Sequence, residues 1–267
     1  NNYDIEASVS YDVSSVEVID NFNTAALLES GYEITNLSKF PPQNLIVSEP
    51  KSFRGVMVKQ VTFIPYSYDF ETQQLSIFNN IEIMINEQES DFDEYNRNVK
   101  LSKAFEPLYE SLIVNYERSN REEDYQTPSI LYICGGSSAN HPFVQELLEW
   151  RHKTGYIVNF ASTSETGTSS TSIKNYIQNA YDNWDNPPEI VALIGDTGGS
   201  YTIGYYTEGW SGYNGAGDFP YCQLDGSDLL PEIFIGRISV NSSSDLSNVL
   251  NKTLAYEKAT YINQTGT

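Results

Sequence analysis

Residues 173–196 read IKNYIQNAYDNWDNPPEIVALIGD, and their pattern changes twice along the way. An amphipathic helical pattern runs into a Pro-Pro break, and a short apolar strand that ends in Gly-Asp follows. Residues 217–239, GDFPYCQLDGSDLLPEIFIGRIS, contain a second strand that leads to Gly-Arg, and a helical pattern follows them. This order predicts an α/β unit with functional loops at the carboxyl ends of its strands.

The same alternation of strands and helices extends back to Ser129. We predict strands over Ile130–Cys134, Tyr156–Ala161, Ile190–Ile194 and Ile233–Ile235, with short strands beside Asp225, and helices over Pro142–Lys153, Ile173–Trp184 and Asp245–Lys258. Ser169 to Ser172 can cap the second helix, and Ser243 or Ser244 the last. The Gly- and Tyr-rich loop of residues 197–217 is too long for a simple connection, so we expect it to line a surface.

Residues 1–98 read instead as β structure, because apolar and polar residues alternate with a period of two. The segments that carry this pattern are SVEVID (15–20), GYEITN (31–36), NLIVSEP (44–50), residues 53–70 and residues 73–88. Residues 68–74 predict a turn, after which Leu75 to Ile85 returns as the partner strand of a hairpin. Between residues 98 and 118 the period becomes helical.

Residues 117–127, ERSNREEDYQT, have almost no apolar content and predict an exposed linker that proteases cut. The prediction is therefore a β-rich domain over 1–117 that ends in a helix, a linker over 118–128 and an α/β unit over 129–267. Overall the chain is an α+β protein.

Charge and composition exclude several classes of function. The 267 residues carry a formal net charge of −21, which argues against nucleic acid and anionic membrane surfaces as partners. No apolar run approaches the roughly 18 residues of a membrane span. No signal peptide is visible, and because the first residue is Asn1 we expect that processing or trimming removed the true N-terminus. The Tyr-rich, Lys-poor composition is common in extracellular bacterial proteins, so we expect a secreted or cell-surface protein.

The two cysteines and two histidines carry little chemistry by themselves. Cys134 lies in an apolar run and Cys222 in a predicted strand, so both are expected to be buried, and a bridge between them stays open. A Cys134–His141 dyad is an alternative, but it needs an exposed thiol within reach of the imidazole. His152 is expected to be solvated at a helix end. Gly135-Gly136 matches no nucleotide-binding motif and predicts a tight turn.

Four aspartates are candidate metal ligands. Asp196 closes an apolar strand, where a carboxylate serves either to cap the loop or to bind a metal. Asp218, Asp225 and Asp228 lie among glycines and backbone carbonyls, the oxygen-rich setting that calcium prefers, although the spacing differs from that of an EF-hand. Solvated turns are the alternative. Arg237 is expected to tie down a loop carboxylate.

The ordered motifs of the second half resemble the gingipain (C25) family of caspase-like cysteine peptidases. They are Leu193-Ile194-Gly195-Asp196, Asp218, Tyr221, Asp225-Gly226, Asp228, Pro231, Ile233 and Ile235-Gly236-Arg237-Ile238-Ser239, with Tyr256-Glu257 in the trailing helix. Residues 147–160, LLEWRHKTGYIVNF, resemble the family's early helix and strand. Residues 53–85 resemble the R-G hairpin of its pro-region, which in such zymogens is a β-rich inhibitor and folding aid.

The resemblance implies the N-terminal portion of a secreted cysteine endopeptidase zymogen, with half of a caspase-like α/β domain. Its catalytic His and Cys are expected beyond Thr267, so no catalytic residue is assigned within this sequence. The expected partners are the remainder of the catalytic domain, in the same or a cleaved chain, and protein substrates. The alternatives are a sortase of a bacterial secretion system, a non-catalytic surface binding or adhesion module, and a receiver- or flavodoxin-like module.

Overall fold

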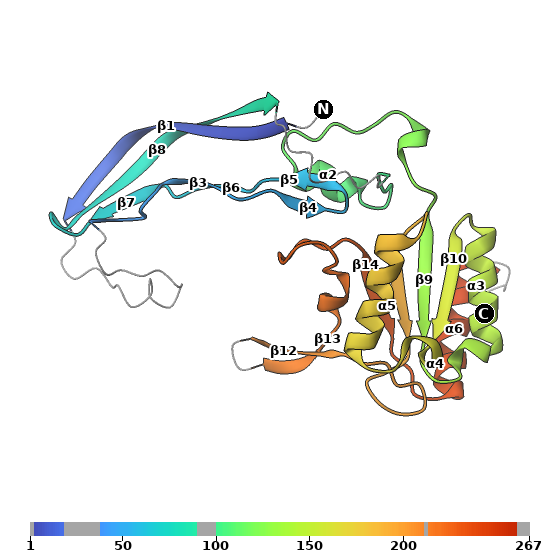
Figure 1. The fold of residues 1–267 in the computed structure, drawn as a ribbon. Coiled ribbons are helices and arrows are strands. Elements are labelled where there is room, and N and C mark those ends of the chain that lie inside the picture. Colours follow the sequence, from blue (N-terminus) through green and yellow to red (C-terminus); the bar gives the residue numbers. More distant parts are fainter. Residues whose placement is uncertain (1–2, 19–37, 90–99, 211–212, 261–267) are drawn as a thin grey trace, which may run out of the picture. The chain divides into compact units, whose positions relative to one another are not determined.

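The computed structural model describes residues 3–18, 38–89, 100–210 and 213–260 (Figure 1). It divides into two compact units, each described here by itself. The first unit comprises Asn1–Lys51 and Met57–Arg97, and the second comprises Ser52–Val56 and Asn98–Thr267. The packed units therefore divide near residue 97 and not at the predicted linker. In addition, a short segment from within the predicted β domain belongs to the second unit.

The described elements that lie wholly in the first unit are strands. They form a sheet of order β1 (Tyr3–Val18), β8 (Gln74–Glu89), β7 (Tyr66–Asp69), β2 (Lys39–Phe40) and a pair of β3 (Leu45–Val47) with β6 (Val61–Phe63). All of these pairings are antiparallel. The paired strands β4 (Lys51–Phe53) and β5 (Val56–Val58) each cross the division between the units. The predicted strand of residues 31–36 lies outside the described residues.

The predicted hairpin turn between β7 and β8 is confirmed. Asp69 pairs with Gln74 across the turn. The Asp69 side chain accepts hydrogen bonds from the N–H groups of Glu71 at 3.0 Å and Thr72 at 2.8 Å. The bond from Thr72 is the main cause that lowers the pKa of Asp69. This carboxylate thus fixes the turn that joins the two strands.

The second unit is built on a parallel sheet of order β10 (Ile157–Ser162), β9 (Ser129–Cys134), β11 (Ile190–Ile194), β14 (Phe234–Ile238). Its other elements are α2 (Glu106–Leu112), α3 (Pro142–Lys153), α4 (Thr163–Thr166), α5 (Ser170–Asn183), α6 (Ser243–Glu257), the hairpin of β12 (Tyr206–Trp210) with β13 (Tyr213–Gly217), and the 3-10 turns η1 (Glu122–Asp124), η2 (Ser138–Asn140) and η3 (Phe219–Cys222). The predicted order of parallel strands and helices is confirmed. The short strands expected beside Asp225 are wrong, because η3 precedes it.

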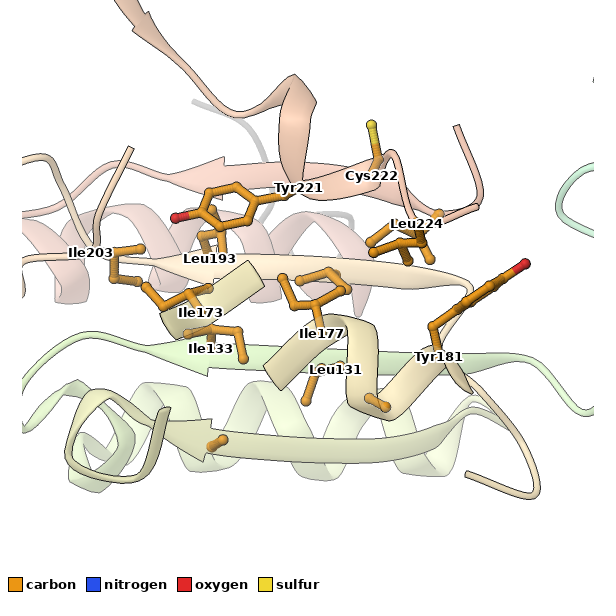
Figure 2. Packing of buried hydrophobic residues seen from close by; sticks show 14 residues of the cluster. Leu131, Ile133, Ile173, Ile177, Tyr181, Leu193, Ile203, Tyr221, Cys222 and Leu224 are labelled. Carbon is orange, nitrogen blue, oxygen red and sulfur yellow. The ribbon is translucent and has the colours of Figure 1, made fainter. Parts of the chain in front are cut away.

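The sheet of the second unit is buried between two helical layers, because successive side chains of a strand point to opposite faces. Leu131 and Ile133 of β9 face α5 and pack with its Ile173 and Ile177 (Figure 2). Ile130, Tyr132 and Cys134 of the same strand face the other way, in a cluster with Val144, Leu147 and Leu148 of α3 and Leu246, Leu250 and Leu254 of α6. The apolar runs of the sequence thus form two buried clusters, one on each face of the sheet.

Three helices begin at capped positions. His141 caps α3, with its Nδ1 accepting a hydrogen bond from the Phe143 N–H at 3.3 Å. Ser169 caps α5 through the Ser172 N–H, which confirms that prediction. The cap of α6 is Ser242, which accepts from the Asp245 N–H at 3.1 Å, so the predicted cap at Ser243 or Ser244 is wrong. The helix needs the residue whose hydroxyl reaches the orphan N–H groups of its first turn.

The predicted linker is shorter than expected. Tyr125 and Gln126 are 7% and 5% exposed, and Tyr125 forms a β-bridge with Leu101. The Tyr125 hydroxyl donates to Glu106 Oε1 at 2.7 Å. These contacts hold the end of the predicted linker in the second unit, and residues 117–123 are left as its mostly exposed part. Within the described ranges, no helix is long and apolar enough to cross a membrane.

Candidate functional site at the carboxyl edge of the parallel sheet

The four parallel strands end level with one another. Ser162 pairs with Cys134, Cys134 with Ile194, and Ile194 with Ile238. The residues that follow these ends therefore gather along one line, which we call the carboxyl edge. Parallel sheets bind ligands at this edge, so the loops that leave it form the candidate site.

Glycines allow a loop to cross the carboxyl edge in direct contact with the strands. A Cβ atom on Gly135 or Gly195 would lie 2.3 Å or 2.0 Å from the carbonyl oxygen of Tyr201, and both glycines directly follow a strand. Gly136 and Gly195 also have φ angles of +53° and +153°, in the region that favours glycine. We call residues 196–204 the crossing loop. The Gly135-Gly136 pair thus serves the close approach of this loop.

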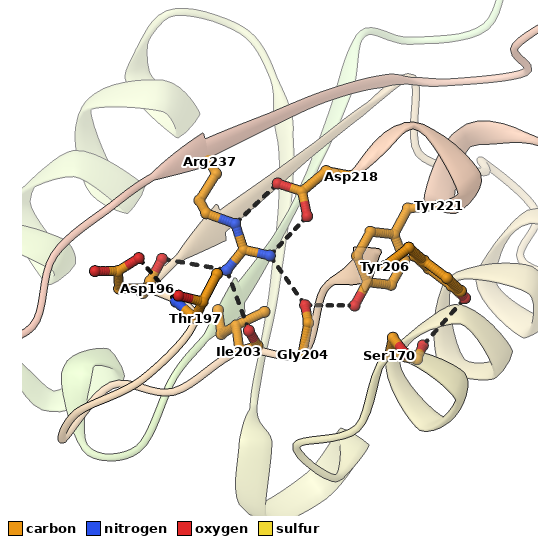
Figure 3. Close-up of polar contacts among 10 residues, drawn as sticks. Ser170, Asp196, Thr197, Ile203, Gly204, Tyr206, Asp218, Tyr221 and Arg237 are labelled. Carbon is orange, nitrogen blue, oxygen red and sulfur yellow. Dashed lines mark hydrogen bonds and ion pairs between the residues drawn. The ribbon is translucent and has the colours of Figure 1, made fainter. Parts of the chain in front are cut away.

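Arg237 of β14 holds the crossing loop and the segment after β13 together (Figure 3). Its Nε and Nη2 donate to the two carboxylate oxygens of Asp218 at 2.8 Å and 2.7 Å. Its guanidinium also donates to the carbonyl oxygens of Gly195, Ile203 and Gly204, at 3.3, 3.3 and 2.9 Å. The side chain of Arg237 is only 12% exposed, and its guanidinium donates its hydrogen bonds to Asp218 and to the backbone. The prediction that it ties down a loop carboxylate is confirmed.

Asp196 acts as a local cap of the crossing loop. Its Oδ1 accepts from the Thr197 N–H at 2.8 Å, and its Oδ2 accepts from Asn241 Nδ2 at 2.9 Å. The hydrogen bond from Thr197 is the main cause that lowers the pKa of Asp196, and Ser239 and Asn241 add to it. A carboxylate at this position therefore stays ionised at the carboxyl edge and partly accessible to solvent.

The other predicted metal ligands lie in different local settings. Asp218 is bound by Arg237, and Asp228 accepts from the Leu230 N–H at 2.7 Å. Asp225 is buried, and its N–H donates to Glu232 Oε2 at 3.2 Å. In the part of the chain that the structure describes, no three His, Cys, Asp or Glu side chains gather in a group that could hold a metal. The structure therefore does not bring Asp196, Asp218, Asp225 and Asp228 together as one cage of carboxylates.

Neither thiol is placed for nucleophilic chemistry. Cys134 and Cys222 are both free, and they are 0% and 2% exposed. Burial raises the pKa of Cys134 to about 12 and that of Cys222 to about 11. His141 contacts Ser243 Oγ through Nε2 at 3.1 Å and caps α3 through Nδ1, so it serves the packing of α3 against α6. These side chains lack the accessible thiolate and adjacent base that such chemistry requires.

The sequence does not predict the burial of several ionisable residues, among them Glu232 and Arg54. Glu232 is fully buried, its Oε2 accepts from the Leu224 N–H at 2.7 Å, and burial raises its pKa to about 7. Arg54 is also fully buried, although it lies in a predicted strand far along the sequence from the sheet that surrounds it. The only signal for Arg54 is its place before Gly55 in the hairpin motif that resembles the family's pro-region.

Comparisons with known proteins bear on both halves of the chain. The model of peptidase family C25 matches residues 123–267, and the model of the C25 propeptide matches residues 1–122. The border between the two matches falls inside the predicted linker. Because the peptidase match covers more than half of the chain, it decides the family.

Relatives of known name agree with these matches. The chain is 29% identical over 251 residues to Lys-gingipain of Porphyromonas gingivalis, covering 90% of this chain and 14% of the relative. It is 25% identical over 228 residues to gingipain R2 of the same organism, covering 82% of this chain and 29% of the relative. A crystal structure of the Arg-specific cysteine proteinase gingipain R shares 20% identity, with a TM-score of 0.41 over 53% of this chain and 30% of that one. The chain spans less than a third of these relatives, and it belongs to peptidase family C25.

Proposed function

We propose that this chain is the pro-region and first part of the catalytic domain of a secreted cysteine endopeptidase zymogen. The family matches support the order, with a propeptide over residues 1–122 and a peptidase segment after it. The parallel sheet with its level carboxyl ends supports a caspase-like α/β half-domain whose chemistry takes place at the carboxyl edge.

The burial of both thiols carries the proposal that the catalytic Cys–His pair lies outside this sequence. A nucleophilic cysteine needs a depressed pKa and access to the substrate, whereas Cys134 and Cys222 are buried and their pKa values are raised. In this proposal the carboxyl edge of this chain packs against the later segment and supports its catalytic Cys and His. Proteolysis would proceed by thiolate attack, with an oxyanion hole built from the later part of the domain.

The expected partner is the remainder of the same catalytic domain. Among the described residues β14 pairs only with β11, so its other edge is open to a further strand. An open edge at a buried parallel sheet is satisfied when another strand adds to it. Protein substrates, secretion to the cell surface and a calcium ion bound near Asp196, Asp218, Asp225 or Asp228 are part of the same proposal. Isothermal titration with calcium before and after chelation tests the metal.

The test of the proposed function uses the parent protein that carries this chain. Casein and peptides with Arg, Lys or apolar residues before the cleaved bond are assayed under reducing conditions, with and without iodoacetamide. We expect turnover that iodoacetamide blocks, and that Cys134→Ser and Cys222→Ser leave at the wild-type level. Loss of turnover in a folded Cys134→Ser or Cys222→Ser variant would contradict the proposal, as would turnover that iodoacetamide leaves intact.

A further inference from the structure

A propeptide arginine lies inside the second unit. Arg54 sits in the turn between β4 and β5, with a φ of +42°, and Gly55 follows with a φ of +81°. The segment Ser52–Val56 belongs to the second unit, whereas the residues on either side of it belong to the first. The turn thus delivers a fully buried guanidinium into the unit that contains the peptidase segment.

Three oxygen acceptors of the peptidase segment surround this guanidinium. Arg54 Nη1 donates to the carbonyl oxygens of Pro188, at 3.0 Å, and of Glu232, and Nη2 donates to Gln126 Oε1 at 3.1 Å. Burial lowers the pKa of Arg54, and interactions with Tyr181 and then Glu189 are the largest that oppose this effect. A planar fork of donors suits such a set of separated acceptors better than the point charge of a lysine.

The acceptors are held in place independently of Arg54. Gln126 Nε2 donates to the Pro187 carbonyl oxygen at 3.0 Å, and the Ser129 hydroxyl donates to the same oxygen at 2.8 Å. The Ser129 N–H donates to Glu189 Oε2 at 3.2 Å. The peptidase segment thus forms a built pocket whose polar atoms point at the guanidinium. If Arg54 left, these buried acceptors would lose their partner at a large cost.

Aromatic rings close the pocket and hold the backbone of the turn. The guanidinium carbon lies 5.3 Å from the ring centre of Phe105 and 5.9 Å from that of Tyr181. The Tyr109 hydroxyl donates to the Arg54 carbonyl oxygen at 3.1 Å, and Phe53 packs edge-on against the Tyr109 ring at 5.4 Å. The polar acceptors of the guanidinium thus belong to the peptidase segment, whereas Phe105 and Tyr109 lie within the propeptide match and support the turn from the propeptide side.

The pocket lies at the opposite end of the sheet from the candidate site. Pro188 and Glu232 come just before β11 and β14, and Ser129 is the first residue of β9. These residues mark the amino-terminal edge of the sheet, so an occupant of the pocket leaves the carboxyl edge untouched. The contact is suited to retention of a bound segment and does not itself block the carboxyl edge.

We propose that the amino-terminal edge of the peptidase sheet carries a guanidinium-binding pocket, and that Arg54 in this pocket keeps the propeptide bound after the chain is cut. The biological cut rests on the proposed function, but the retention does not. It can be measured on a chain that is cut between α2 and Gln126, so that Arg54 and its three oxygen acceptors lie on different fragments.

The experiment introduces a site for a sequence-specific protease between Val114 and Asn115, where Val114 as a whole residue is 94% exposed. The folded protein is cut, diluted, and followed by native mass spectrometry for separation of the two fragments. We expect Arg54→Lys and Arg54→Met each to raise the dissociation rate at least about tenfold, because hydrogen bonds to a buried charge are lost. Arg121→Lys is the matched control, since that side chain is 70% exposed and paired with Glu123.

A second measurement covers the case in which the Arg54 variants fail to fold. The cut wild-type protein is incubated with an excess of a peptide of residues 50–58, PKSFRGVMV, or of the same peptide with neutral citrulline at position 54. The propeptide fragment also contacts the peptidase segment through Ser102 and Phe105. We therefore expect the arginine peptide to raise the release rate of the fragment, and the citrulline peptide to be at least about tenfold weaker in this effect. Equal competition by the two peptides, or wild-type retention in a folded Arg54→Met variant, would overturn the proposal. Neither readout involves peptidase activity, so failure of the proposed function is seen separately.

Discussion

Arg237 and Asp218 share two hydrogen bonds of 2.8 Å and 2.7 Å, although nineteen positions separate them in the sequence. The pair joins the carboxyl end of β14 to the residue that follows β13. The same guanidinium holds three backbone carbonyl oxygens, two of them in the crossing loop. Arg237 therefore links the crossing loop, the end of β11 and the segment after β13 through one side chain.

Replacement of that side chain is expected to destabilise the protein. In Arg237→Lys the fork of donors is lost, so Asp218 and the carbonyl oxygens of the crossing loop compete for one ammonium group. We expect a loss of about 2 kcal/mol in the free energy of unfolding, measured with urea. Lys153→Gln removes an exposed ion pair with Glu149 and serves as the control, with an expected change below about 0.5 kcal/mol. An equal effect of both changes would contradict the role of Arg237.

The close approach of the crossing loop makes Gly195 intolerant of a side chain. A Cβ atom there would lie 2.0 Å from the Tyr201 carbonyl oxygen, at a φ of +153°. We expect Gly195→Ala to lower the free energy of unfolding by at least about 2 kcal/mol. Gly236→Ala is the matched control, because nothing lies within 4 Å of a Cβ atom at that position. Thermal unfolding of the two variants side by side decides the matter.

Glu232 makes stability depend on pH near neutrality. Its folded pKa of about 7 lies above the ordinary value of a glutamic acid, so the folded state holds this proton more tightly than the unfolded state. The contribution of Glu232 is therefore most favourable at low pH and is lost as pH rises through the folded pKa. We expect the stability difference between wild type and Glu232→Gln to change between about pH 5 and about pH 7.5 in this direction. A difference that stays constant over this range would show that Glu232 does not titrate there.

The two thiols should react slowly in the folded protein. Cys134 and Cys222 are buried, and burial raises their pKa values to about 12 and about 11, so little thiolate is present at pH 8. We expect iodoacetamide to label both residues at least about a hundredfold more slowly than in urea. Intact mass measured over time gives both rates. Fast labelling of either thiol in buffer would place it at an accessible site.

Limited proteolysis tests the exposed segment between the propeptide and peptidase matches. The side chains of Arg118 and Arg121 are 58% and 70% exposed, on a stretch with little regular structure. We expect trypsin to cut first after these two residues, since an exposed, locally unfolding backbone fits a protease. Mass mapping of early fragments identifies the cuts. First cuts within Val56–Ile85 or Ile190–Ile194 would contradict the expectation.

The strands of the parallel sheet could be read from the sequence because their signal is local. Ile190–Ile194 is an apolar run between a Pro-Pro break and Gly-Asp, and it folds as β11 with the same bounds. The helix expected over residues 98–118 is shorter, from Glu106 to Leu112, because Leu101 pairs with Tyr125 instead. The hairpin of β12 and β13 lies within the predicted loop of residues 197–217, because its Gly- and Tyr-rich strands lack the alternating apolar pattern that predicts a strand.

For the candidate site as well, contacts that depend on local sequence could be predicted, and contacts between distant residues could not. An ion pair between Arg237 and a carboxylate could be expected, because the cation lies near a strand end. That the carboxylate is Asp218 depends on how the loops fold. The pocket of Arg54 depends on Pro188 and Glu232, which lie 134 and 178 positions away. No periodicity or local propensity encodes contacts at such separations, and only packing in three dimensions reveals them.

The second unit combines Ser52–Val56 with the chain from Asn98 onward, and this has a consequence for synthesis. Ribosomes release the turn that carries Arg54 early, and its partner Glu232 emerges only 178 positions later. Closing so long a loop costs about 2–3 kcal/mol more chain entropy than closing a loop of about 10 residues. All residues of the first unit have been made once Arg97 is added, whereas the second unit cannot be completed until most of its own sheet has left the ribosome. The Arg54 side chain therefore stays exposed to solvent during synthesis until the residues that form its pocket have been made.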